Sequence, residues 1–108
     1  MEEEIEIVIK EYALWQLEEE YSYFYKEYSE KYADSFYDSF FEVIENIQPN
    51  YLSFPECRFL ITKNKIYRNI VWGNFLIVFK IKKKKIEVLC LFHTKQNPKK
   101  LKVARKVK

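Results

Sequence analysis

The sequence is poor in the residues that build loops, metal centres and glycine-rich ligand sites. Its 108 residues include one Gly, three Pro, two Cys and one His. A single glycine excludes the glycine-rich loops that cradle phosphate groups, because those loops need several glycines at fixed spacing. The low glycine and proline content also argues against a loop-rich or disordered chain. Cys57 and Cys90 are too few and too isolated for a zinc site, so no metal or cofactor is expected.

Signals for targeting and for membrane insertion are missing as well. The N-terminal stretch MEEEIEI has neither the basic region nor the apolar region of a signal peptide. No apolar run approaches the roughly 18 residues that a membrane span needs. We therefore expect a reduced, cytoplasmic protein with no membrane partner. The length predicts one domain over residues 1–108 with one sizeable core, followed from about residue 99 by a basic tail.

Aromatic and charged residues are abundant, and the charges are unevenly distributed. The chain holds nine Phe, nine Tyr and two Trp. Residues 1–54 carry 14 acidic and three basic residues, whereas residues 55–108 carry 16 basic and two acidic residues. Such asymmetry indicates either a directional partner, often a nucleic acid, or two halves that neutralise each other across the fold.

The first half of the chain reads as a strand and two helices. EIEIVI alternates apolar and polar residues, as a half-buried strand does. Leu14, Leu17, Tyr21, Phe24 and Tyr28 then recur at helical spacing, and the interpretation is that this stripe belongs to the core. Ser29 is a candidate N-cap of a second helix, whose stripe consists of Ala33, Phe36, Phe40, Ile44 and Ile47.

Proline and short apolar runs shape the second half. Pro49 should end the second helix, since proline cannot continue it. An irregular stretch follows, with a possible short strand at residues 58–62. Three runs of period two then predict strands: KIYRNIVW, FLIVFKI and IEVLCLF. Gly73 and Asn74 form a two-residue hairpin signal between the first two, and the middle run is apolar on both faces, which predicts a central strand.

The element order predicts an α+β fold, β-α-α-β-β-β. A helical hairpin should pack on one face of a small, twisted, mainly antiparallel sheet, leaving the other face open for the basic residues. The residues show no standard catalytic set, and Cys90 and His93 should lie on opposite faces of their strand.

Cations and aromatics are the remaining candidates for function. Lysine and arginine bind phosphates through Coulomb attraction, and an exposed Tyr67 or Trp72 could stack on bases. His93 could act as a general base. The competing interpretations are structural: Arg68 pairs with a helix glutamate, His93 caps the last strand, and the lysines protect an edge strand from pairing. The candidate nucleic-acid or target-binding residues are Lys63, Lys65, Arg68, Lys95, Lys99 and Lys100.

The stretch from Ser53 to Leu101 resembles the C-terminal half of the RelE/ParE superfamily of type II toxins, often called plasmid stabilisation proteins. The resemblance rests on three features of the meander, the three successive strands predicted in the second half of the chain. They are the Tyr67–Arg68 pair at the start of its first strand, Gly73–Asn74–Phe75 at the first turn, and His93 with Lys95 at the end of its last strand. The first half is similar too, with a short strand before a helical hairpin that contains Ala33 and Phe36.

The resemblance implies a toxin of a bacterial toxin–antitoxin module, but the family divides into two mechanisms. RelE-like members cut mRNA in the ribosomal A site, which would make Arg68, His93 and Lys95 the catalytic candidates. ParE-like members lack the catalytic set and inhibit DNA gyrase. This chain has apolar Ile70 and Leu76 where RelE-like members carry bases, which favours the ParE-like function and leaves the question of enzymatic activity open.

Three hypotheses follow from the resemblance. The first is a growth-arresting gyrase inhibitor, the second a ribosome-dependent mRNA endonuclease, and the third a non-toxic relative that only binds its antitoxin. The implied protein partner in each case is an antitoxin whose extended or helical segment covers the meander and the helix groove. The gyrase or the ribosome with its mRNA is the implied target in the first two cases.

Overall fold

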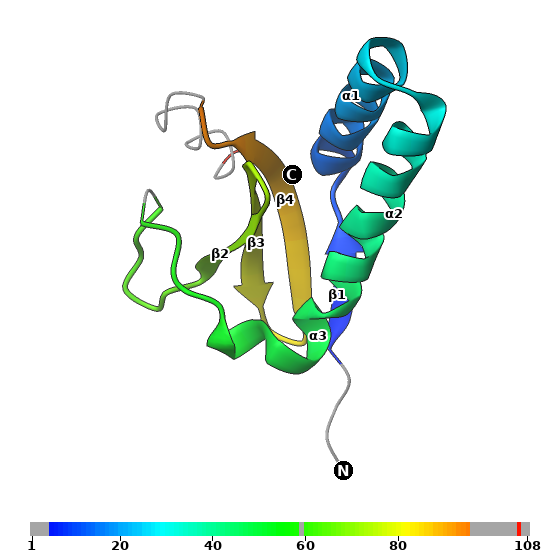
Figure 1. Cartoon of the computed structure of the whole chain (residues 1–108). Helices are drawn as coiled ribbons and strands as arrows, with labels where there is room; N and C mark the ends of the chain where they lie inside the picture. The colour runs from blue at the N-terminus through cyan, green and yellow to red at the C-terminus, as the bar shows by residue number, and fades with distance from the viewer. Residues whose placement is uncertain (1–4, 59, 96–105, 107–108) are drawn as a thin grey trace.

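The computed structural model describes residues 5–58, 60–95 and 106, and it shows the predicted order of elements (Figure 1). A short strand and the two long helices come first, then two short helical turns, and finally three strands. The elements are β1 (Glu6–Ile9), α1 (Glu11–Glu27), α2 (Glu30–Glu45), α3 (Ile47–Asn50), the 3-10 turn η1 (Tyr51–Ser53), β2 (Tyr67–Trp72), β3 (Phe75–Lys82) and β4 (Lys85–His93).

The four strands form one sheet in the order β1-β4-β3-β2. Strands β2, β3 and β4 pair antiparallel as a meander, and β1 pairs parallel with β4. β3 is therefore central, as its two apolar faces predict, and β1 and β2 are the edges. The α+β fold with a mainly antiparallel sheet is confirmed.

The α1–α2 hairpin covers one face of the sheet (Figure 1). Ser29 caps α2, since its Oγ accepts a hydrogen bond of 3.0 Å from the Tyr32 N–H, so the predicted N-cap is confirmed. The main core lies between the hairpin and this face, and its buried members include Leu17, Phe40, Ile77 and Phe79.

Strand β1 is too short to pair with all of β4, and a side chain of α1 bonds to the β4 backbone beyond the end of β1. β1 pairs only with Lys85–Val88. Further along, the Gln16 side chain donates to the Leu91 carbonyl at 2.9 Å and accepts from the Leu91 N–H at 2.8 Å. The amide thus mimics a neighbouring strand and fixes α1 against β4.

The predicted helix stripe is only partly right. Leu17 is fully buried, but the buried neighbour on α1 is Ala13, and Tyr28 is 64% exposed. The hairpin extends past the end of the sheet (Figure 1), so its outer aromatics have no sheet beneath them. Helical spacing correctly identified one face of the helix, but not how far along the helix the sheet reaches.

The second face of the sheet is not open, which corrects the prediction. Buried residues there form a second cluster that joins β2, β3 and β4 to the segment before β2; its members include Cys57, Leu60, Tyr67, Val78, Leu89 and Cys90. The strand expected at residues 58–62 is also wrong, because the described residues there form no strand. Their segment touches the sheet through an isolated bridge between Glu56 and Arg68.

Two local features refine the chain path. Pro49 lies inside α3, a single turn, where its missing N–H costs nothing. Gly73 has φ of +58° in the β2–β3 turn, where glycine adopts a positive φ without strain. None of the helices in the described part of the chain is both long and apolar enough to cross a membrane.

Candidate functional site

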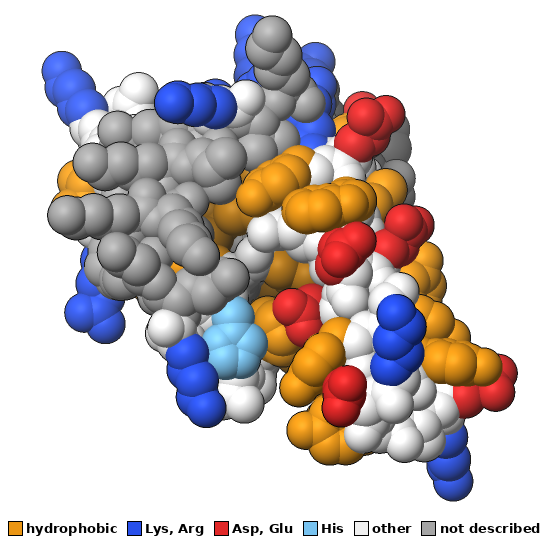
Figure 2. Space-filling model, turned by 90° about the horizontal axis from the view of Figure 1, so that it is seen from above, with side chains coloured by type: hydrophobic (Ala, Val, Ile, Leu, Met, Phe, Trp, Pro, Cys, Tyr) orange, Lys and Arg blue, Asp and Glu red, His pale blue; other side chains and the backbone are white. Residues whose placement is uncertain are grey.

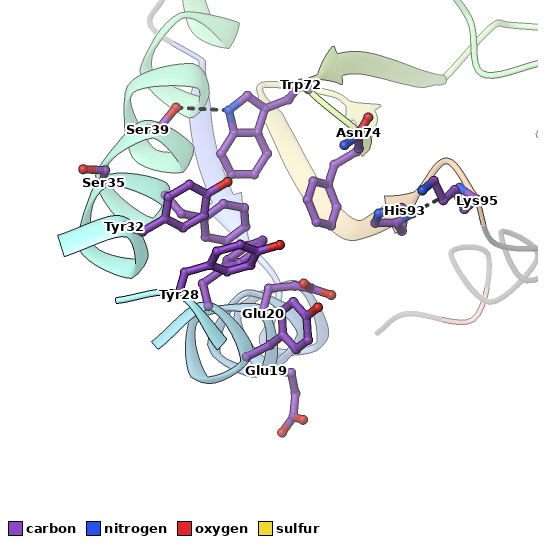
Figure 3. Close-up of a pocket in the computed structure, with 15 residues that line it drawn as sticks. Glu19, Glu20, Tyr28, Tyr32, Ser35, Ser39, Trp72, Asn74, His93 and Lys95 are labelled. Carbon is purple, nitrogen blue, oxygen red and sulfur yellow. Dashed lines mark hydrogen bonds between the residues drawn. The ribbon is translucent and has the colours of Figure 1, made fainter. Parts of the chain in front are cut away.

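An aromatic groove opens where the hairpin extends beyond the end of the sheet (Figures 2 and 3). Its volume is about 870 Å³. One wall comes from α1 and α2, and the other comes from the β2–β3 turn and the end of β4. The lining residues are Glu19, Glu20, Tyr23, Phe24, Tyr28, Tyr32, Ser35, Phe36, Ser39, Trp72, Gly73, Asn74, Phe75, His93 and Lys95.

The aromatic rings of the groove hold one another in place. Phe36 packs on Trp72, with ring centroids 4.8 Å apart, and on Phe24 at 4.7 Å. The Trp72 Nε1–H donates to Ser39 Oγ at 3.1 Å, which fixes the indole ring. Tyr28 and Tyr32 stack at 5.1 Å near the outer end, and at least half of each side chain is exposed. The floor is therefore rigid and apolar, while the outer rings offer uncovered apolar surface.

Charged groups stand at the rim of the groove. His93 ends β4 and lies edge-on against Phe75, with ring centroids 5.1 Å apart. Its Nδ1 accepts a hydrogen bond of 3.1 Å from the Lys95 N–H. Partial burial raises the pKa of the Glu20 carboxyl above its usual range, and the nearby His93 imidazole partly offsets that rise. The groove thus joins an apolar floor to the carboxyls of Glu19 and Glu20 on one wall and to basic groups on the other (Figure 3).

Arg68 lies away from this groove and is bonded to the backbone. Its Nε donates to the Lys65 carbonyl at 3.0 Å, and its Nη1 donates to the carbonyls of Leu52 and Phe54 at 2.9 and 2.8 Å. The expected partner was a helix glutamate, whereas these bonds run to main-chain oxygens. Arg68 and the core residue Ile70 are two positions apart on β2, so both project from the helix-covered face of the sheet.

The structure does not bring Arg68 and His93 together. Arg68 pairs with Phe79 of β3, and His93 pairs with Phe75 of the same strand. Four residues along a strand correspond to about 13 Å. Lys95, by contrast, lies beside His93 at the groove.

The predicted basic residues also separate along the sheet. Lys63 and Lys65 are exposed in the segment that leads into β2. The neighbouring Ile66 carbonyl accepts from the Ile81 N–H at 2.7 Å, which places this segment at the β3–β4 turn. Lys95 follows the opposite end of β4. Lys99 and Lys100 lie outside the described residues.

The aromatic residues expected to stack on bases both pack within the fold, and Trp72 keeps some exposure at the groove. Tyr67 is buried in the second cluster, and Trp72 packs among Phe36, Phe40 and Phe75. The cysteines are buried too, and burial raises the pKa of the Cys90 thiol to about 12, which makes it a poor nucleophile at neutral pH. Cys90 and His93 do lie on opposite faces, as predicted, because one joins the second cluster and the other lines the groove.

No group of three or more His, Cys, Asp or Glu side chains that could hold a metal occurs in the described ranges.

Sequence reasoning missed the groove because it assigned the aromatic stripe to the core. One signal was present. The far end of the hairpin uses tyrosine where a closed core would use leucine or isoleucine, as at Tyr23, Tyr28 and Tyr32. Tyrosine suits surfaces that are half apolar and half wet, and it is enriched at protein interfaces.

No family model matches the chain, and no curated protein matches it. A solved structure does: a chain of the "Chromosomal ParDE TA system from P. aeruginosa", with a TM-score of 0.73 and 14% sequence identity over 87% of this chain and 100% of that chain. The fold that the sequence resemblance implied is therefore confirmed.

Proposed function

We propose that this chain is the toxin of a bacterial type II toxin–antitoxin module. The observation that carries the proposal is the fold correspondence, which spans the entire length of a chain from a ParDE toxin–antitoxin system. The motifs around Tyr67, Gly73 and His93 agree with it. Growth arrest, a cytoplasmic site of action and a role in plasmid stabilisation belong to the same proposal.

The partner in this proposal is a cognate antitoxin, and the aromatic groove supports its presence. The groove offers exposed rings of Tyr23, Tyr28 and Tyr32 on a rigid base. Aromatic anchors of this kind contribute much of the binding energy at protein interfaces. A helical or extended antitoxin segment with apolar side chains fits such a surface.

For the target, we propose DNA gyrase, which makes the chain an inhibitor rather than an enzyme. The nuclease alternative needs Arg68, His93 and Lys95 to act on one phosphate. Arg68 bonds to backbone carbonyls and lies about 13 Å along the sheet from the level of His93. That arrangement favours a binding function for this fold.

A ribosome-dependent mRNA endonuclease is the second candidate, and the groove rim favours it. Glu20, His93 and Lys95 bring a carboxyl, an imidazole and an ammonium group to one concave site. Such groups can move protons and stabilise a charged phosphate. A third candidate is a non-toxic relative that only binds the antitoxin.

Pulse labelling after induction of the chain alone in a bacterial host separates the three candidates. Early loss of DNA synthesis with translation intact is the expected result, and early loss of protein synthesis would instead indicate the nuclease. Unchanged growth would favour the non-toxic relative. Induction of His93→Asn provides the comparison, because a nuclease would lose its toxicity with this change and a gyrase inhibitor would lose little. Co-expression of the protein encoded beside the chain should restore growth.

A further inference from the structure

A buried carboxylate organises a group of lysines at the end of the sheet away from the groove. Glu87 is 3% exposed, and three ammonium groups surround it. Its Oε2 lies 3.1 Å from Lys10 Nζ and 3.5 Å from Lys85 Nζ, and its Oε1 lies 3.1 Å from Lys82 Nζ. One negative charge thus holds three lysines in a fixed arrangement and leaves the group with net positive charge.

More lysines extend this group into a platform. Lys80 shares the face of Glu87, and its Nζ lies 5.5 Å from the centroid of the Tyr67 ring, which restrains it. Lys83 and Lys84 form the exposed β3–β4 turn. We call these residues the lysine platform: Lys10, Lys80, Lys82, Lys83, Lys84 and Lys85. The segment with Lys63 and Lys65 borders it.

Five of the six lysines of the platform, Lys80 and Lys82–Lys85, lie on the two central strands or in the turn between them, so they do not cover an exposed strand edge. The edges of the sheet are β1 and β2, whereas the turn joins the two central strands. A short polar turn without six neighbouring lysines would connect β3 to β4 equally well. Clustering like charges opposes folding, because the charges repel one another. A bound anionic ligand would offset this repulsion, and we therefore ask which ligand the lysines fit.

The platform also differs from a protein-docking surface. The large apolar side chains that are at least half exposed in the described chain lie elsewhere, and none falls between Lys80 and Lys85; they are Trp15, Tyr23, Tyr25, Tyr28, Tyr32, Leu52, Ile61 and Val71. Protein partners need such anchors. A phosphate backbone needs only well-placed cations, because counterion release drives its binding.

We propose that the lysine platform binds the phosphate backbone of a nucleic acid without reading its sequence. The platform lies about 26 Å along β4 from His93, since eight residues separate Lys85 from His93. A nucleic acid there and a protein segment in the groove can therefore bind at the same time. The proposal concerns binding alone and stands whether or not the chain arrests growth.

The test measures binding of a labelled, mixed-sequence single-stranded RNA to the purified full chain over a series of salt concentrations. The test variant is Lys83→Gln with Lys84→Asn. It leaves the three lysines on Glu87 in place, and asparagine tolerates the φ of +64° at position 84. A charge-matched control is Lys26→Gln with Lys31→Gln on the exposed hairpin, and a second is Lys99→Gln with Lys100→Gln in the tail. Thermal unfolding confirms that all variants fold.

We expect the test variant to lose affinity several-fold. Its salt dependence should also weaken, by about 0.7 in the slope of log K against log salt for each lysine removed. The hairpin control should bind as the native chain does. An unchanged test variant overturns the proposal, and so does an equal loss in the hairpin control, which would report net charge alone. A loss of RNA affinity confined to the tail variant would overturn the proposal as well. Poly-glutamate that competes as effectively as unlabelled RNA would also overturn it, because that result would indicate an acidic protein ligand.

Discussion

At the scale of single residues, Arg68 links the two ends of the irregular segment that runs from η1 to β2. Its guanidinium bonds to the carbonyls of Leu52 and Phe54 on one side and of Lys65 on the other. Carbonyl groups in irregular segments need donors, and a charged donor gives stronger bonds than a neutral one. The sequence identified Arg68 as a cation worth attention, but two of the three carbonyls that it meets come from 14 and 16 residues earlier in the chain.

Arg68→Lys should therefore lower stability while keeping the charge. Lysine cannot reproduce the planar fork that reaches three carbonyls. We expect a loss of about 1–3 kcal/mol in the free energy of unfolding, measured by urea denaturation. The exposed Lys26→Arg is the control, the opposite exchange on the surface of α1, and it should change stability little. Unchanged stability together with lost toxicity would show instead that Arg68 acts on the target.

Glu87 is the second residue whose neighbours decide its role. Burial alone would raise the pKa of its carboxyl, but hydrogen bonds from Lys10 and Lys82 outweigh burial and hold that pKa below its usual range. Each of the three lysine side chains that contact the carboxylate keeps some exposure to solvent. The pair energies are therefore modest compared with those of a fully buried ion pair.

Glu87→Gln should lower stability at neutral pH by about 1–2 kcal/mol, since the lysines lose the charge that holds them together. Because the folded state has the lower pKa, this stabilisation is present above the unfolded-state value of about 4.3. It is lost as the pH falls through the lower folded-state value. Urea midpoints of the native chain and of Glu87→Gln should thus converge in acid. Midpoints that stay equally far apart down to the lowest pH would contradict this linkage.

At the scale of elements, local signals in the sequence predicted what local chemistry controls. Ser29 caps α2, Gly73 supplies the positive φ of its turn, and the doubly apolar β3 is central. The features that the sequence did not predict depend on contacts between segments that are distant in the chain. β4 contains an irregularity opposite Val78 and Phe79, because Val78 pairs with Cys90 and Phe79 with Val88. A period-two pattern cannot show such a shift in register.

Ser29→Ala tests how much the cap contributes to the hairpin. The connection between α1 and α2 consists of Tyr28 and Ser29 alone. The Ser29 N–H donates to the Phe24 carbonyl at the end of α1, and the Ser29 hydroxyl accepts from the Tyr32 N–H at the start of α2. Loss of its bond to the Tyr32 N–H should lower the free energy of unfolding by about 1 kcal/mol. Ser22→Ala, at an exposed position inside α1, should be neutral or slightly stabilising. Equal effects of the two changes in thermal unfolding would contradict a capping role.

At the scale of the whole molecule, the fold separates features that the sequence places together. The basic half of the chain predicted one phosphate-binding surface from Lys63 to Lys100. Because β4 runs the length of the sheet, Lys95 lies at the groove end and Lys82–Lys85 lie at the other end. The acidic half forms the hairpin, whose Glu20 faces into the groove. Sequence reveals the amount of charge in each half, but only the topology shows that the chain carries two surfaces of different chemistry.

The groove gives a prediction that depends on this arrangement. Tyr28 and Tyr25 are both on or beside α1 and are 64% and 50% exposed, so neither is a large part of the core. Tyr28 lines the groove, whereas Tyr25 packs against Tyr21 with ring centroids 6.2 Å apart. We expect Tyr28→Ala to weaken binding of the proposed antitoxin by about 1–2 kcal/mol, which is roughly tenfold in Kd. Tyr25→Ala should leave the affinity close to native in the same calorimetric titration. If both changes weaken binding equally, the antitoxin contacts the outer surface of the hairpin, and if only Tyr25→Ala does, the groove is not its docking site.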